Sequence, residues 1–392
     1  MSKIKKTIPR LRFSEYKKDS NWEEKKIYQL GNLINGLTYS PKDIREKGLL
    51  VLRSSNVQNG VVDFNDRVFV RPDIKGANLS KPNDILICVR NGSKRLIGKN
   101  ALIPIDIPLA THGAFMTMFR AKYPEFIFQL FQSEAYDKQV KADLGATINS
   151  INGKNFLKYE FMVPRNPKEQ QKIASCLSSL DELIASHNDK LKTLENHKKG
   201  LMQNLFPQEG QKAPNYRFPE FENDEEWVVK SFEDLFTIGN GRDYKHLEEG
   251  DIPVYGSGGY MLSVDKCLYE GDSACIGRKG TINNPLFLTG KFWTVDTLFY
   301  THSFTDCIPK FIFYIFQNIN WLKHNEAGGV PSLSKTNIYK IETKVPKPNE
   351  QIKVVAVLSG LDNLINIQEG KVGKLQQHKK GLMQGLFPKI ES

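Results

Sequence analysis

Two long stretches of the chain carry apolar residues at alternating intervals of four and three positions. They are Ile173, Leu177, Leu180, Ile184, Leu191, Leu194, Leu201 and Leu205 in the first stretch, and Val354, Leu358, Leu361, Ile365, Val372, Leu375, Leu382 and Leu386 in the second. This heptad pattern predicts two long helices, each of which packs along one apolar seam. We expect the helices at residues 168–206 and 349–387, each about 58 Å long and ended by Pro207 and Pro388.

The two helices belong to a long internal repeat. Both end in the same phrase, HKKGLMQNLFP at 197–207 and HKKGLMQGLFP at 378–388, at an offset of 181 residues. The same offset aligns EQQKIASCLSSLDELI (169–184) with EQIKVVAVLSGLDNLI (350–365), and PRLRFSEYKKDSNW (9–22) aligns with PNYRFPEFENDEEW (214–227). Repetition on this scale indicates two copies of one structural unit, a globular region followed by a helix.

Four seam positions are polar: His187, Lys198, Gln368 and Lys379. They are either tolerated near solvent or set the register and direction of pairing, as single polar seam residues can. Parallel pairing would place Lys198 against Lys379, whereas antiparallel pairing would place His187 against Gln368 and each lysine against leucine. We therefore predict an antiparallel pair and a pseudo-two-fold symmetric molecule.

The rest of the sequence predicts two globular regions of mixed α/β type. Each opens with a helix-like segment after its tryptophan, Trp22 or Trp227, and continues in short β-rich runs with glycine and asparagine turns. The α/β fold class then has four parts. We expect a first globular domain at 1–165, a central helix at 166–208, a second globular domain at 209–347 and a C-terminal helix at 348–392.

The charge, the cysteines and the apolar runs of the sequence bear on where the protein is found and what it binds. The formal net charge is +11, which fits either a well-solvated surface or a polyanionic partner such as nucleic acid. The five cysteines form no CxxC pair, which argues against a disulfide framework and a zinc site. No apolar run approaches the roughly 20 residues that a membrane span needs. We expect a cytoplasmic protein that does not enter the membrane.

One polar pattern, D-x5-R-x-G-[ST], occurs in both globular regions, starting at Asp84 and at Asp272. It predicts a strand that enters a tight turn, with glycine where φ is positive. The pattern fits a plain hairpin, but an arginine and a hydroxyl at a loop tip can also contact phosphates or base edges, and basic residues cluster there. We therefore favour DNA contact. With the neighbouring loops, the candidate DNA-binding residues are Arg53, Ser54, Asn56, Gln58, Arg90, Ser93, Lys94, Arg95, Arg242, Tyr255, Ser257, Arg278, Lys279 and Thr281.

No pattern in the sequence points to catalysis. GSKRLIGKN (92–100) fails the Walker spacing, and GNGR (239–242) lacks the later glycine of a dinucleotide site. No carboxylate–lysine set typical of nucleases assembles by spacing. The sequence therefore predicts no catalytic residue and no metal ligand.

Two globular regions that alternate with two repeated helices, each helix ending in HKKGLMQ-x-LFP, resemble the specificity subunit of type I restriction–modification systems. The openings Arg12–Phe13 and Arg217–Phe218 add to the resemblance, which covers essentially the whole chain. It implies that the globular regions are target-recognition domains, each reading one half of a bipartite double-stranded DNA site. It also implies that the helices space these domains and bind two methyltransferase subunits, and that restriction subunits join the assembly. This subunit would bind no cofactor, while its partners would use S-adenosylmethionine, ATP and Mg.

The repeated phrase suggests where the methyltransferase subunits bind. A glycine inside a helix costs up to roughly 1 kcal/mol relative to alanine, so a retained glycine can serve the close approach of another backbone. The candidate partner-binding residues are Gly200, Leu201, Gln203, Gly381, Leu382 and Gln384. Two other readings stay open: a coiled-coil adaptor that does not read DNA, and a nuclease or methyltransferase of an uncharacterised kind.

Overall fold

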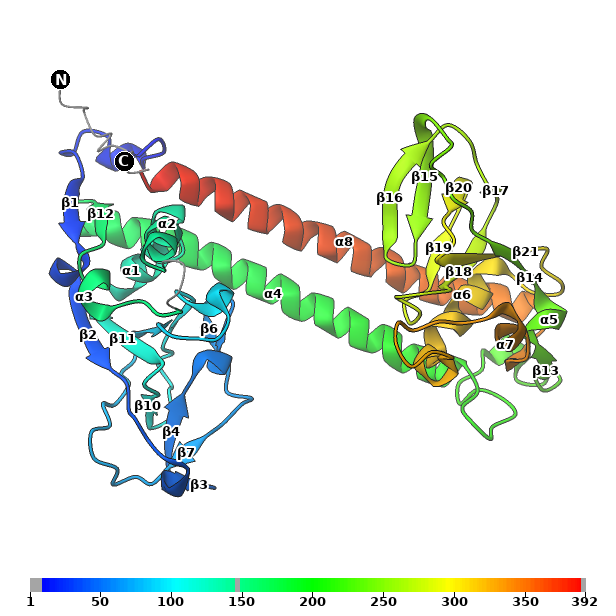
Figure 1. Ribbon diagram of the computed structural model, residues 1–392, viewed down its shortest axis with the longest axis horizontal. Coiled ribbons are helices and arrows are strands. Elements are labelled where there is room, and N and C mark those ends of the chain that lie inside the picture. Colours follow the sequence, from blue (N-terminus) through cyan, green and yellow to red (C-terminus); the bar gives the residue numbers. More distant parts are fainter. Residues whose placement is uncertain (1–8, 145–148, 389–392) are drawn as a thin grey trace. The chain divides into compact units, whose positions relative to one another are not determined.

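The computed structural model describes residues 9–144 and 149–388. The chain divides into two compact units, which are described separately below (Figure 1). Unit 1 comprises Met1–Asn188 and Lys371–Ser392, and unit 2 comprises Asp189–Gly370.

The two predicted helices are present, with ends within one residue of the expected positions. They are α4 (Pro167–Leu205) and α8 (Pro348–Leu386), and each contributes one half to each unit. Their seam residues face the cores: Leu177 and Leu358, at equivalent positions of the repeat, are both fully buried. The heptad spacing therefore correctly predicted which side of each helix is buried at these positions.

Inside each unit the two helix segments run antiparallel, as predicted. In unit 1 the beginning of α4, at Leu177, shares a core with the end of α8, at Leu386. In unit 2 the end of α4, at Leu205, shares a core with the beginning of α8, at Leu358. We also predicted that His187 faces Gln368. These two residues belong to different units, so their contact stays a prediction.

The seam lysines have partners that the prediction of a leucine opposite each one did not include. Lys198 forms an ion pair with Asp362 at 2.6 Å in unit 2, and Lys379 forms an ion pair with Asp181 in unit 1. The two aspartates are equivalent in the repeat, and a helix of the globular region contacts each. Gln129 donates to Asp181 (2.9 Å), and the Tyr314 hydroxyl donates to Asp362 (2.6 Å). A half-buried ammonium is stabilised by a carboxylate, which leucine cannot supply.

In the part of unit 1 that the structure describes, the globular region holds two four-stranded sheets and two small two-stranded ones. The first sheet has the order β2 (Gly31–Asn35), β11 (Met116–Ala121), β8 (Ile85–Cys88), β9 (Asn100–Leu102), and the second has the order β10 (Ala110–His112), β4 (Leu49–Leu52), β7 (Phe69–Val70), β3 (Ile44–Arg45). The two-stranded sheets are β1 (Glu23–Lys26) with β12 (Glu160–Val163), and β5 (Val57–Gln58) with β6 (Val61–Val62). Its helices are α1 (Pro124–Leu130), α2 (Glu134–Asp143) and α3 (Gly153–Phe156).

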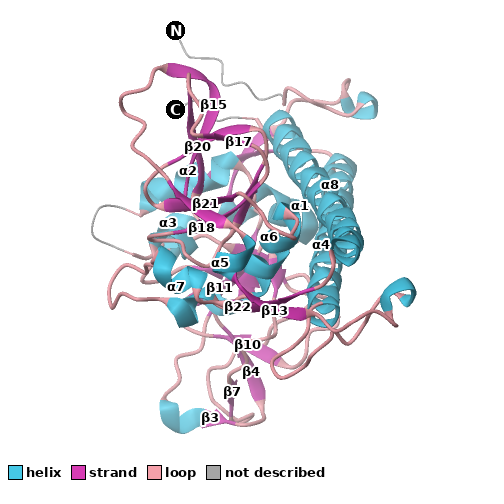
Figure 2. Ribbon diagram, turned by 90° about the vertical axis from the view of Figure 1, so that its right-hand side faces the viewer, coloured by secondary structure: helices cyan, strands magenta, loops and turns pink. Residues whose placement is uncertain are grey.

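Unit 2 has two four-stranded sheets and one two-stranded sheet among its described residues. Figure 2 distinguishes the helices from the strands by colour. One sheet has the order β14 (Thr237–Asn240), β21 (Leu298–His302), β18 (Ser273–Gly277), β19 (Leu286–Leu288), and the other has the order β16 (Gly259–Val264), β15 (Glu249–Gly256), β20 (Lys291–Thr294), β17 (Tyr269–Glu270). β13 (Val228–Ser231) pairs with β22 (Glu342–Val345), and the helices are α5 (Phe232–Leu235), α6 (Pro309–Asn318) and α7 (Lys335–Tyr339). In both units one sheet contains a single parallel pair, β4 with β10 or β15 with β20. The mixed α/β fold class is confirmed.

A strand comes first after each tryptophan, and the helix-like segment that we predicted is reduced to a short turn of helix after that strand, Ile27–Gln29 in unit 1 and Phe232–Leu235 in unit 2. β1 follows Trp22 and pairs antiparallel with β12, which immediately precedes α4. β13 follows Trp227 and pairs in the same way with β22, which immediately precedes α8. The partner strand lies more than a hundred residues away in the chain, so local sequence could not reveal the pairing.

A buried ion pair fastens the start of each globular region to the start of its long helix. The Arg12 guanidinium donates to both carboxylate oxygens of Glu169 at 2.8 Å, and Trp22 Nε1 donates to the same carboxylate at 3.1 Å. In unit 2, Arg217 donates to Glu350 at 3.0 and 2.8 Å, and Trp227 Nε1 donates at 3.1 Å. We call these groups the Arg–Glu–Trp clamps.

Candidate nucleic-acid interface

The two D-x5-R-x-G-[ST] patterns form equivalent loops. β8 and β18 begin one residue after Asp84 and Asp272, and the arginines that follow these strands are both exposed. The Arg90 N–H donates to the Phe115 carbonyl at 3.1 Å, and the Arg278 N–H donates to the Thr297 carbonyl at 2.8 Å. Both arginines are thus fixed at their backbone to the residue that immediately precedes β11 or β21. We call these the arginine loops.

The other motif residues differ between the units. Gly280 has φ 86°, as predicted, but Gly92 is not among the positive-φ glycines. Asp84 is buried and accepts two hydrogen bonds from Arg120 at 2.7 Å, whereas Asp272 is exposed. The Asp84–Arg120 pair joins β8 to β11, so this aspartate supports the sheet.

Each loop arginine lies near an aromatic ring of its own unit. The Arg90 guanidinium carbon is 5.7 Å from the Phe115 ring centre, and that of Arg278 is 5.9 Å from the Phe299 ring centre. A guanidinium over an aromatic face is attracted by the ring quadrupole and loses some of its freedom. Both side chains are therefore oriented while their charge remains at the surface.

The arginine loop of unit 1 gathers most of the cations that the sequence predicted there. Ser93, Lys94 and Arg95 are all exposed and come shortly after Arg90 in the chain. The preceding candidate loop reaches the same place, because Asn91 Nδ2 donates to Ser54 Oγ at 3.1 Å. Arg53 forms an ion pair with Asp66 at 2.6 Å, which partly neutralises it, while Gln58 is exposed.

Asn56 does not fit the predicted role in DNA contact. Its side chain is fully buried. Its amide nitrogen donates to the carbonyls of Asp63 and Asp66, and its oxygen accepts from the Arg53 N–H. All of these bonds hold the loop together, because a buried amide must satisfy its donors and acceptors inside the protein.

In unit 2 the predicted residues come together at the turn between β15 and β16. The Ser257 N–H donates to Thr297 Oγ1 at 3.4 Å, and a side chain at Gly280 would begin 3.5 Å from Ser257 Oγ. These contacts join the turn to the arginine loop, where Arg278, Lys279 and Thr281 are exposed. Arg242 is exposed nearby in the fold, and its carbonyl accepts from Trp293 Nε1 at 2.8 Å. Tyr255 is half-buried, with its ring 6.1 Å from that of Tyr260.

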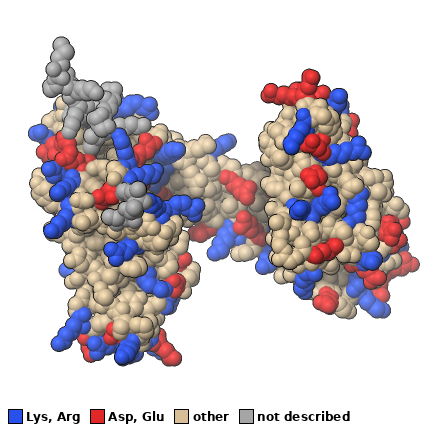
Figure 3. Space-filling view, in the orientation of Figure 1, with Lys and Arg blue, Asp and Glu red and all other residues tan. Residues whose placement is uncertain are grey.

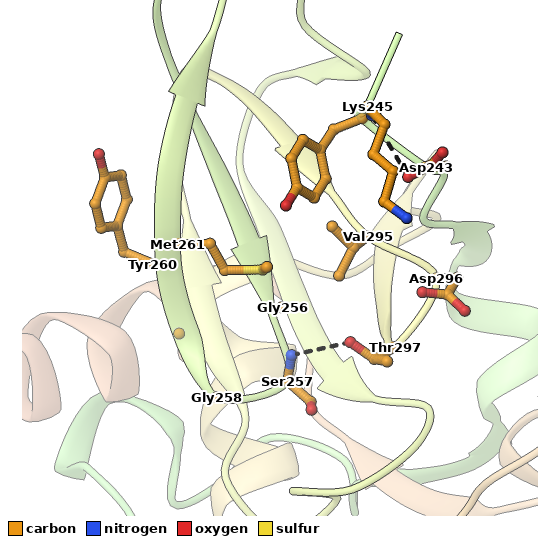
Figure 4. Close-up of a pocket in the computed structure, with 12 residues that line it drawn as sticks. Asp243, Lys245, Gly256, Ser257, Gly258, Tyr260, Met261, Val295, Asp296 and Thr297 are labelled. Atoms are coloured by element: carbon orange, nitrogen blue, oxygen red, sulfur yellow. Dashed lines mark hydrogen bonds between the residues drawn. The ribbon is translucent and has the colours of Figure 1, made fainter. Parts of the chain in front are cut away.

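A cleft of about 570 Å³ opens beside this turn in unit 2 (Figure 4). Its lining residues are Asp243, Tyr244, Lys245, Gly256, Ser257, Gly258, Gly259, Tyr260, Met261, Val295, Asp296 and Thr297. Figure 4 shows Met261 turned toward Gly256 and Tyr260 on the opposite side of β16. Both side chains are large and about half exposed or more, at 48% and 63%.

Sequence reasoning missed Lys245, Tyr260, Met261 and Asp296 as members of this surface. The aromatic that follows the GSGG turn was the available signal for Tyr260. Asp296 gave no signal, because the backbone pairing that brings its turn to the β15–β16 hairpin is long-range. In unit 1, a second cleft of about 570 Å³ is lined by Arg90, Ala114, Asp143, Ser150, Asn155 and their neighbours.

The candidate partner-binding residues fall into two groups. A side chain added at Gly200 or Gly381 would meet no other atom within 4 Å, so both glycines face open space. Leu201 and Leu382 are partly buried against the chain's own cores. Gln203 is exposed, while Gln384 is exposed and donates to Glu134 of α2. The two glycines thus leave room for the close approach of another chain.

The surface shows no single basic face in the view of Figure 3, where Lys and Arg are interspersed with Asp and Glu over both units. All five cysteines are free thiols. Within residues 9–144 and 149–388 there is no group of three or more His, Cys, Asp and Glu residues able to hold a metal ion. In the same ranges no helix is both long and apolar enough to cross a membrane.

Comparisons with known proteins agree with this architecture. A putative type I restriction enzyme specificity subunit (MjaX) from Methanocaldococcus jannaschii is 24% identical over 412 residues, covering 94% of this chain and 93% of that protein. The type I restriction enzyme EcoKI specificity subunit from Escherichia coli is 30% identical over 175 residues, which cover 42% of this chain but only 36% of that protein.

The fold has a counterpart among solved structures. The crystal structure of the S subunit of a type I restriction–modification system from M. genitalium superimposes with a TM-score of 0.67 at 18% identity, covering 98% of this chain and 100% of that one. The family model described as "Type I restriction modification DNA specificity domain" matches residues 19–196 and 224–377. Since these two matches take in most of both globular regions and both long helices, the chain belongs to the type I restriction–modification DNA specificity family.

Proposed function

We propose that this chain is the DNA-recognition subunit of a type I restriction–modification complex and performs no catalysis itself. Each globular region reads one half of a bipartite double-stranded DNA site, and the long helices space the two regions. The same helices bind two methyltransferase subunits, and restriction subunits complete the assembly. S-adenosylmethionine, ATP and Mg are used by those partners, in the cytoplasm.

The observation that carries the proposal is the pair of arginine loops. Both units present an exposed arginine at the same backbone position, held by a hydrogen bond to the residue before β11 or β21. An oriented guanidinium beside small polar side chains can bind a guanine edge bidentately or a phosphate. The loops next to each arginine loop differ in sequence between the units, which suits two regions that read different sequences.

The partner assignment rests on the repeated helix ends. Gly200 and Gly381 face open space at equivalent positions, in a phrase that is nearly identical in the two copies. A surface that is repeated, while the surrounding loops have diverged, suits two copies of one partner. The proposal keeps the four residue ranges predicted from the sequence: two recognition domains at 1–165 and 209–347, and two helices at 166–208 and 348–392.

The test is methylome sequencing of cells that express this chain with its methyltransferase partner. The wild-type chain should give one bipartite motif. Arg90→Ala should relax or abolish one half of the motif and Arg278→Ala the other, with a loss of about 1–3 kcal/mol where the arginine reads a base. Arg165→Ala is the matched control, because this exposed arginine lies outside both arginine loops. Unchanged methylation of both half-sites in either loop variant would refute the assignment.

Two measurements separate the other readings. An adaptor that does not read DNA would show no salt-sensitive binding to duplex DNA, whereas phosphate contacts make affinity fall steeply with salt. An enzyme would show turnover by the purified chain alone, dependent on metal or S-adenosylmethionine.

A further inference from the structure

A short turn precedes the central strand of one sheet in each unit. In unit 1 the Met116 N–H donates to the Gly113 carbonyl at 2.8 Å, and in unit 2 the Leu298 N–H donates to the Val295 carbonyl at 2.9 Å. The third residue of each turn, Phe115 or Thr297, also accepts the backbone hydrogen bond from the loop arginine. The turns 113–116 and 295–298 are thus the same structural element, and we call them the reading turns.

The backbone of the reading turn in unit 2 is firmly held. The Val295 N–H donates to the Tyr255 carbonyl at 2.9 Å, and the Arg242 N–H donates to the Thr294 carbonyl at 2.8 Å. A side chain at Gly241 would lie 1.9 Å from the Val295 carbonyl oxygen, so only glycine fits there. A side chain at the tip of this turn is therefore presented from a fixed position.

The tip residues of the two reading turns differ completely in chemistry. Unit 1 carries Ala114 and Phe115, and Phe115 is 57% exposed although it is large and apolar. Unit 2 carries Asp296, which is exposed, and Thr297. Ala114 lines the cleft of unit 1, and Asp296 lines the cleft of unit 2, where it points away from the backbone of its turn (Figure 4). A fixed element with variable tips is what two readers of different sequences require.

The negative charge of Asp296 would oppose binding if this surface contacted only DNA phosphates. Within the described residues its carboxylate has no ion-pair partner within 4 Å, although Lys245 lines the same cleft and Arg278 donates to its backbone carbonyl at 3.5 Å. A free carboxylate near the DNA backbone is repelled by phosphates, so it weakens binding unless it meets a donor. The donors that DNA offers in the major groove are the amino groups of cytosine and adenine, and aspartate characteristically accepts from cytosine N4.

We propose that the reading turns are specificity-determining elements: Asp296 accepts a hydrogen bond from the amino group of a cytosine in one half-site, and Phe115 contacts the methyl group of a thymine in the other. Phenylalanine is among the side chains that make apolar contacts with this methyl group. The inference rests on the proposed function, since it assigns a base to residues on the surface that the arginine loops mark out.

The experiment is methylome sequencing of the full complex with three variants of the chain. Asp296→Ala should lower the preference for cytosine over other bases at one position of one half-site by roughly 10- to 100-fold. Asp296→Asn should move that preference to adenine, because asparagine pairs bidentately with adenine N6 and N7. Phe115→Ala should relax a thymine in the other half-site. Asp251→Ala is the control, because Asp251 is an exposed carboxylate on β15, outside the cleft-lining residues.

Each outcome is informative because the two half-sites report on the same molecule. Normal methylation at the half-site that is not targeted shows that the variant folds and assembles. An unchanged motif in Asp296→Ala, or a wild-type half-site without cytosine, would overturn the role of Asp296. Equal tightening of binding to all sequences in Asp296→Ala would also overturn it, because it would make the carboxylate a repelling charge only. Absence of any motif with the wild-type chain would instead refute the proposed function.

Discussion

Removing the arginine of one Arg–Glu–Trp clamp should destabilise one unit and spare the other. In unit 2, Arg217→Ala leaves the Glu350 carboxylate with the Trp227 N–H as its one remaining side-chain donor among the described contacts. The side chains of Arg217 and Glu350 are only 12% and 3% exposed, so water cannot replace the lost guanidinium. Removing one partner of a buried ion pair costs about 3–5 kcal/mol. The same reasoning applies to Arg12→Ala in unit 1, where the exposures are 7% and 1%.

The lost contacts go beyond the ion pair. Arg217 also donates to the carbonyls of Asp224 and Glu225, at 2.8 and 3.0 Å, so it fixes the segment that leads to β13. Its pKa is raised, mainly by the hydrogen bonds to Glu350, so it is protonated at neutral and moderately alkaline pH. Because its folded-state pKa is raised, the stabilisation by this cation is fully present below the ordinary arginine pKa and is lost only as the pH rises through the raised value.

Native-state hydrogen exchange read by mass spectrometry is the assay, because it reports each unit separately. Arg217→Ala should lower protection in β13, β22 and the start of α8 by about 3 kcal/mol or more, while β1, β12 and the start of α4 keep wild-type protection. Lys212→Ala serves as the control, since its ion pair with Glu226 is 77% and 64% exposed and should contribute at most about 1 kcal/mol. If Arg217→Ala changed protection no more than Lys212→Ala, the clamp would not hold the unit together.

Three further predictions concern the long helices. Tryptophan at Gly200 or Gly381 should reduce the number of bound methyltransferase subunits, because a bulky side chain fills the space open to a partner; full assembly by native mass spectrometry with both positions changed would contradict this. Lys198→Glu should destabilise unit 2 by about 3 kcal/mol or more, and adding Asp362→Lys should recover part of this loss. If the double variant were no more stable than the single variant in thermal unfolding, the two side chains would not interact. The fragment 1–207 contains one globular region and one seam helix, so it should dimerise through its exposed leucine stripe and direct methylation of a palindromic site; a stable monomer in ultracentrifugation would rule out interchangeable halves.

The sequence alone determined the parts of this protein whose signals are local or repeated. The heptad spacing predicted the ends of both helices to within one residue, because the apolar residues of such a seam recur in every turn of the helix and need no distant contact to be recognised. Comparison of the two copies gave the antiparallel direction within each unit, since parallel pairing would have set Lys198 against Lys379. The arginine loops were visible for the same reason: the pattern around Arg90 and Arg278 occurs twice, although the surrounding loops have diverged.

Only the tertiary structure decided what depends on contacts between distant segments. The strands after Trp22 and Trp227 looked helical until their pairing with β12 and β22 was known. Asn56 looked like a DNA-contacting amide until its burial showed that it satisfies its own loop. Asp296 carried no sequence signal, because its place at the cleft comes from backbone bonds to β15, about forty residues earlier in the chain. Periodicity records which face of an element is buried, but not what it is buried against, because long-range partners share no spacing in the chain.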